Sequence, residues 1–204
     1  MAKATGFSAL AALTTFTAKK WFTKSFVDLV EEISLRYSKR TEILDGGLIT
    51  KGTTLSATVC DITVAEMKII MGGVLSTVSA ISDKDCLAPE SAFGQAIFSD
   101  GSNGAGLTLS SSARAFITII VCNSDSNGST SATPLVIAVI NGVGSSPVAT
   151  AHLTTAEINA ALAASTGKHA GVTEWAHIGR FEVLEGTFGA LQNNTENRNN
   201  HLRA

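Results

Sequence analysis

The sequence predicts a mainly β protein, an antiparallel β-sandwich or a barrel-like domain, on three observations. Runs rich in β-branched residues recur after residue 44, and such residues favour strands. Gly-Gly and Asn-Gly pairs lie within or at the end of two of these runs, which is typical of tight turns between antiparallel strands. Helical periodicity is confined to a segment before residue 44 and a short segment near residues 155–165. We therefore expect two parts, an N-terminal arm with an amphipathic helix at residues 1–44 and a β-rich domain with a polar C-terminal tail at residues 45–204.

The N-terminal helix is predicted from Lys19 to Arg40, where apolar residues recur at steps of three and four and charged residues fill the other positions. Gly46 and Gly47 follow and break the pattern. The apolar stripe is a candidate surface for docking or oligomer formation, and packing against the chain's own β domain is the alternative. Its candidate interaction residues are Trp21, Phe22, Phe26, Leu29, Val30 and Ile33.

Strand-like runs occupy most of the remaining chain, with a hairpin expected at Gly72-Gly73. The run "ARAFITIIVC" is too continuously apolar for a half-exposed strand, so we expect it to be central. Pro134 is expected to open the strand that ends near Asn141-Gly142, because a missing N–H donor costs least there. The predicted strand runs lie at residues 53–64, 68–81, 113–122, 134–144 and 175–186.

A short helix is predicted between the last two of these runs. Thr154 and Glu157 have the spacing of a capping box, and a stripe of Ile158, Ala161 and Leu162 follows before Gly167. The final segment, residues 190–204, is polar with almost no apolar anchor, so we expect it to order only against a partner.

Composition limits the classes of partner. The 204 residues suffice for one ordinary domain, the formal charge is −2 and only 16% of residues are charged. This leaves no basic field for a phosphate backbone, so we expect no nucleic acid partner. The longest apolar run is strand-sized, so we expect no membrane span. So few charges favour a surface that neighbouring molecules cover over one that charge repulsion keeps apart from them.

The residues that could perform chemistry form no convincing site. Cys60, Cys86 and Cys122 are odd in number and widely spaced, so we expect reduced, buried thiols. The stretch "NSDSNG" from Asn123 alternates like a calcium loop, but its twelfth position is Pro134 instead of a bidentate Glu. "GSNGAG" lacks the lysine of a phosphate-binding loop.

The four histidines also lack the spacing of helical metal ligands. We therefore expect no metal, no cofactor and no enzymatic activity. Trp175 precedes "HIGRFEV" and is interpreted as a core residue, with a sugar-stacking role as the alternative.

Two stretches resemble β-rich virion proteins of tailed bacteriophages. The stretch "GGLITKGTTLSATVCDITVAEMKIIMGGVLSTVSAI" combines a glycine-led strand, an alternating strand and a glycine-bearing hairpin, as in those proteins. The layout of "LTTAEINAALAAS" followed by "WAHIGRFEVLEGTFGALQNNT" is similar to the end of phage head-fibre and capsid-decoration proteins. Together they span roughly half of the chain by layout. At "AEMKIIM" the chain departs from the small-residue turn that is frequent in the family.

The resemblance implies a non-enzymatic viral structural protein on the particle surface, often trimeric, with no catalytic residues to carry over. The first hypothesis is a capsid decoration or cement protein, or a head-fibre base, that binds the major capsid protein or other virion proteins as a homo-oligomer. Its location would be the virion, assembled in the bacterial host cytoplasm. The alternatives are a tail-associated adaptor or fibre protein, and a glycan-binding module in which Trp175 and Phe181 stack on sugar.

Overall fold

The computed structural model describes residues 28, 41–87, 96–102, 107–124, 130–144, 146–147, 151–166, 169 and 171–193. The chain divides into two compact units, Met1–Arg40 and Thr41–Ala204. All of the described strands belong to the second unit. Apart from Asp28, the predicted helix at Lys19–Arg40 lies outside the described residues.

The second unit consists mostly of strands in antiparallel sheets, which confirms the predicted fold class. In chain order its elements are β1 (Glu42–Gly46), β2 (Ile49–Leu55), β3 (Cys60–Val64), β4 (Met67–Met71), β5 (Val74–Val78), β6 (Ile81–Asp85), β7 (Ile97–Phe98), β8 (Ala115–Ser124), β9 (Thr130–Ile140), β10 (Gly142–Val143), β11 (Ser146–Pro147), α3 (Thr155–Ala164), β12 (Trp175–Leu184) and β13 (Thr187–Asn193).

The largest sheet has the strand order β13-β12-β8-β9-β7. Its pairs are antiparallel except for β7 and β9, which run parallel. The apolar run of β8 is the middle strand, as its sequence predicts. Successive side chains of a strand point to opposite faces, and both faces of β8 are covered: Ile117 and Ile119 belong to one buried cluster, and Ile120 belongs to another.

The larger cluster lies between this sheet and two smaller sheets, β2-β3-β6 and β1-β4-β5. Ile49 and Ile62 reach it from the second sheet, Ile69 from the third, and Phe181 from β12. A Cβ atom on Gly179 of β12 would lie only 2.8 Å from Ile49 Cδ1. Glycine at this position therefore allows β12 and β2 to approach closely.

The predicted hairpin is confirmed, because Met71 pairs with Val74 across Gly72 and Gly73. Both glycines have positive φ angles, +56° and +80°, as such a tight turn requires. The run at residues 53–64 is divided instead of continuous: β2 ends at Leu55 and β3 starts at Cys60. The two strands then pair with each other.

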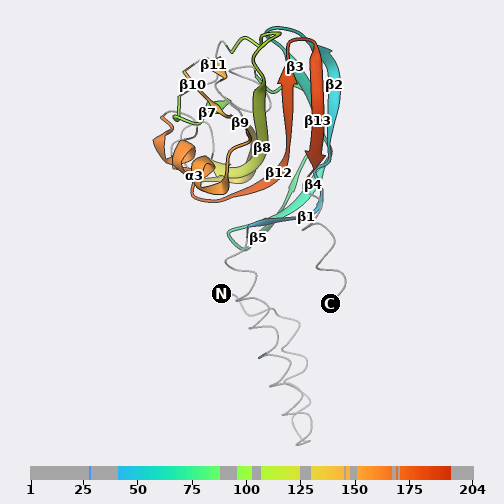
Figure 1. Ribbon diagram of the computed structural model, residues 1–204. Helices are drawn as coiled ribbons and strands as arrows, with labels where there is room; N and C mark the ends of the chain where they lie inside the picture. Colours follow the sequence, from blue (N-terminus) through green and yellow to red (C-terminus); the bar gives the residue numbers. More distant parts are fainter. Residues whose placement is uncertain are drawn as a thin grey trace, which may run out of the picture. The chain divides into compact units, whose positions relative to one another are not determined.

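The short helix α3 begins as predicted, with both hydrogen bonds of the capping box between Thr154 and Glu157 present. Its buried residues Ile158, Ala161 and Leu162 belong to the smaller cluster, together with Ile120 and Ile137 of the main sheet. Figure 1 shows α3 beside the curved strands β8 and β12, away from β2 and β13. The helix ends at Ala164, before the predicted stop at Gly167.

Two expectations about strand ends are wrong. Pro134 lies inside β9 and does not open it. It is tolerated there because the β8–β9 register is irregular between the Cys122–Leu135 and Ser124–Thr130 pairs.

The polar tail begins later than predicted, because residues 190–193 form the end of β13. Leu191 packs against the larger cluster. The Asn193 amide accepts a hydrogen bond from Ile49 N at 2.8 Å and donates one to Ile49 O at 3.2 Å. A side-chain amide thus takes the place of a backbone partner between β13 and β2.

Candidate functional site

The predicted docking stripe is not part of the described structure. Trp21, Phe22, Phe26, Leu29, Val30 and Ile33 all lie outside the described residues. The same holds for Asp125 and Asn127 of the calcium-like stretch. Their roles therefore stay predictions.

At the beginning of "GSNGAG", the carboxylate of the preceding residue, Asp100, accepts hydrogen bonds from the loop. Asp100 accepts hydrogen bonds from Ser102 N at 3.0 Å, Ser102 Oγ at 2.6 Å and Gly144 N at 3.1 Å. These bonds, chiefly the one from the Ser102 hydroxyl, hold the pKa of Asp100 below its ordinary value. The N–H donors of Ser102 and Gly144 therefore bind a carboxylate of the protein itself.

The cysteines are free thiols and all three are buried, as predicted. The hydrogen bond between the thiols of Cys86 and Cys60, followed by burial, raises the pKa of Cys86 well above its ordinary value. A thiol is nucleophilic only as the thiolate. Cys86 is therefore an inert, protonated side chain at neutral pH.

The histidines occupy separate environments. His152 packs edge-on against Phe116, with ring centroids 5.1 Å apart. Desolvation, followed by the nearby Arg180 charge, lowers the pKa of His152, so its ring is neutral at neutral pH. His169 is buried and His177 lines a cavity, while His201 lies outside the described residues. Among the residues that the structure describes, no group of three or more His, Cys, Asp or Glu side chains could hold a metal ion.

The cavity lies where α3 leaves part of the main sheet uncovered. It has a volume of about 340 Å³ and is bounded by the N-terminus of α3 and by strands β8 and β12. Its lining residues are Leu153, Thr154, Thr155, Ile158, Thr118, Trp175, His177 and Arg180. We call it the α3 cavity. Its volume lies at the lower end of the range for small-molecule sites, about 300–1,000 Å³.

Trp175 is half-buried in the wall of this cavity, which agrees only in part with its interpretation as a core residue. Its indole Nε1 donates a hydrogen bond to Asn159 Oδ1 at 2.8 Å. Phe181, the other proposed sugar platform, is completely buried and stacks on Phe188 at 4.7 Å between ring centroids. Phe181 therefore cannot contact a ligand, and that part of the glycan hypothesis is wrong.

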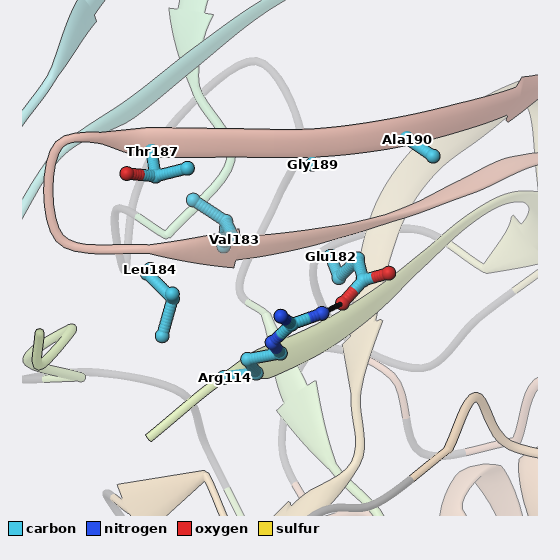
Figure 2. A pocket seen from close by; sticks show the side chains of 7 residues that line it. All are labelled: Arg114, Glu182, Val183, Leu184, Thr187, Gly189 and Ala190. Atoms are coloured by element: carbon cyan, nitrogen blue, oxygen red, sulfur yellow. Dashed lines mark hydrogen bonds and ion pairs between the residues drawn. The ribbon is translucent and has the colours of Figure 1, made fainter. Parts of the chain in front are cut away.

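A second hollow, of about 190 Å³, lies along β12, β13 and the start of β8. Figure 2 shows Arg114 and Glu182 meeting in it as an ion pair. A Cβ atom on Gly189 would lie 2.7 Å from Glu182 Cγ. The glycine thus leaves room for the acid, whose charge is already matched by Arg114. The small volume and the satisfied ion pair make this hollow the weaker candidate site.

The β4–β5 turn carries the third feature, an apolar hairpin tip formed by Val74 and Leu75. Their side chains are 63% and 66% exposed. They stand at the start of β5, an edge strand of the sheet β1-β4-β5. Exposed apolar side chains on an edge strand are typical of surfaces that pair with another molecule.

Sequence reasoning missed Thr118 and Arg180 of the α3 cavity. Thr118 is the one polar residue within "AFITIIVC", and Arg180 is the one charged residue within "WAHIGRF". These interruptions were the available signal. The two residues pair directly across β8 and β12.

In the described part of the chain, no helix has the length and apolar character needed to cross a membrane. Comparison with family models, with curated proteins and with solved structures finds no match to this chain.

Proposed function

We propose that this chain is a non-enzymatic structural protein of a bacteriophage virion that binds and stabilises the capsid surface, as a decoration or cement protein or a head-fibre base. The assignment to a virion rests on the resemblance of two sequence stretches to virion proteins of tailed bacteriophages. The partners would be the major capsid protein or other virion proteins, with the chain acting as a homo-oligomer.

The observation that carries the binding role is the apolar hairpin tip. Val74 and Leu75 keep about two thirds of their surface exposed, at 63% and 66%, although burying such a side chain is worth about 1.5–3 kcal/mol. The antiparallel β4–β5 pairing holds both residues in a defined position. A contact of this size is weak alone, but many copies on a symmetric shell give a strong combined attachment.

The hairpin tip is tested with Val74→Asp and Leu75→Asp together in the full chain. We expect at least a tenfold loss of co-sedimentation with phage heads that lack this protein, because two charges would have to be buried in the interface. Val143→Asp is the matched control, since Val143 is also exposed, at 57%, but lies on β10. It should bind like the unmodified chain, and circular dichroism verifies that each variant is folded.

Two results would contradict the proposal at different levels. Equal sedimentation of the double variant and the unmodified chain would refute the hairpin tip as the contact. Absence of the unmodified chain from the heads, with antibody labelling on the tail in electron micrographs, would refute the capsid role and favour the tail adaptor.

A further inference from the structure

We propose that the α3 cavity binds a sugar ring that carries a carboxylate group. This inference goes beyond the capsid role and does not depend on it. Four features of the cavity support it: a buried hydroxyl without a partner, the start of a helix, one arginine and one half-buried tryptophan.

The buried hydroxyl belongs to Thr118 in the middle strand β8. Its side chain lines the cavity and only 2% of the residue is exposed. Its Oγ1 has no hydrogen-bond partner among the described residues. Buried polar atoms in folded proteins are nearly always paired, so an unpaired hydroxyl in a cavity wall indicates that a ligand group supplies the partner.

The helix start contributes polar residues to the same cavity. Thr154 and Thr155, the N-cap and first residue of α3, are lining residues, and helix N-termini attract oxygen-rich groups. Glu157 accepts hydrogen bonds from Thr154 N and Thr154 Oγ1, both at 2.7 Å. This acid offsets part of the helix dipole, so we assign neutral hydroxyl groups of the ligand to this end.

Arg180 is the one residue among the lining residues that is an arginine, a lysine or an acid. We therefore assign the carboxylate of the ligand to the part of the cavity beside Arg180. Its Nε donates to Gln192 Oε1 at 2.7 Å, which fixes the guanidinium plane. An arginine has five N–H donors, and the two terminal nitrogens suit a carboxylate geometry. Arg180 and Thr118 are register partners on β12 and β8, and both line the cavity.

Trp175, the first residue of β12, completes the site. The hydrogen bond from Nε1 to Asn159 at 2.8 Å fixes the orientation of the indole ring. Aromatic rings pack well against the apolar C–H face of a sugar ring. The cavity volume of about 340 Å³ limits the ligand to roughly one ring.

The experiment uses the fluorescence of the full chain, which has two tryptophans, Trp21 and Trp175. In a Trp21→Phe background the signal comes from Trp175 alone. Titration with glucuronic acid should give a saturable change with a Kd on the order of 1 mM. Glucose should bind about tenfold more weakly, because it lacks the charge-assisted bond to Arg180. Calorimetry on the unmodified chain checks the result, and the absence of saturable binding by both methods would overturn the proposal.

Three variants separate a binding role from a structural one. Thr118→Val keeps the shape and removes the unpaired hydroxyl, so its melting temperature should be unchanged or higher while glucuronate binding falls about fivefold. Arg180→Gln should abolish the preference for glucuronate over glucose. Arg114→Gln, in the other hollow, should bind like the unmodified chain. Undiminished binding by Thr118→Val, or a retained preference in Arg180→Gln, would show that the cavity does not act as proposed.

Discussion

At the scale of single residues, Asp83 has an unusual backbone conformation, and its carboxylate connects β6 to β2. Asp83 of β6 has a φ angle of +51°, which side-chain-bearing residues rarely adopt. Its oxygens accept hydrogen bonds from Thr53 N at 2.5 Å and Thr53 Oγ1 at 2.6 Å. Its own N–H donates to Thr63 Oγ1 at 3.0 Å. These bonds join β6 to the middle strand β3 and to β2 on the other side of it.

The same bonds make the stability of the sheet depend on pH. The Thr53 hydroxyl, followed by the Thr53 N–H, lowers the pKa of Asp83 below its ordinary value of 3.8. A carboxyl whose folded pKa is lowered stabilises the protein above its unfolded pKa, and this stabilisation is lost as the pH falls through the folded pKa. The direction is the same for Asp100 and Glu157, whose pKa values are also lowered.

Asp83→Asn tests this dependence while keeping a residue type that tolerates positive φ. We expect the variant to be less stable than the unmodified chain at neutral pH. The difference should shrink as the pH falls through the lowered Asp83 pKa, because the unmodified carboxyl then loses its charge. Urea denaturation across that pH range measures it. Thr53→Val should reproduce the effect from the donor side, and a difference that stays constant with pH would contradict the explanation.

At the scale of elements, the helix α3 shows how local signals and packing combine. The capping box sets where the helix starts, and the buried stripe of Ile158, Ala161 and Leu162 attaches it to the main sheet. A helix of 10 residues is marginal alone in water. Both its start signal and its packing are therefore needed to hold the wall of the α3 cavity.

Thr154→Ala removes the cap and should reduce the free energy of unfolding by about 1 kcal/mol, within a range of about 0.5–2 kcal/mol. The expected cause is the loss of the Thr154 side chain that accepts from Glu157 N at 3.3 Å. Urea denaturation at neutral pH measures the change. Thr155→Ala, one position later, should alter stability by less than about 0.5 kcal/mol, and equal losses for both variants would show that the cap is not responsible.

Elements also show which features were predictable. The start of α3, the Gly72-Gly73 hairpin and the central position of β8 follow from local patterns, and each was predicted. The edge strand β13 was missed because its sequence, TFGALQN, has only two large apolar residues, Phe188 and Leu191, both of which pack against the larger cluster. The pairing of Arg180 with Thr118 depends on a register shift between His177 and Gly179, which no local pattern encodes.

At the scale of the whole molecule, the predicted docking stripe and the apolar hairpin tip are two separate proposals for attachment. If the stripe docks on the particle, Phe26→Asp with Ile33→Asp in the full chain should reduce co-sedimentation with heads at least tenfold, since the stripe would lose its apolar character. Asp28→Asn, at an exposed position, is the control and should bind normally. A lower melting temperature with undiminished binding would instead show that the stripe packs within the protein.

The amide of Asn193 next to Ile49 also has a practical consequence. The two bonds fasten the end of β13 to the start of β2. The turn at the other end of β13 is open, since a Cβ atom on Gly186 would meet nothing within 4 Å. The Glu185–Gly186 turn is therefore a suitable place to insert an epitope. It contributes no residue to the α3 cavity or to the apolar hairpin tip, so both could be assayed on the tagged chain.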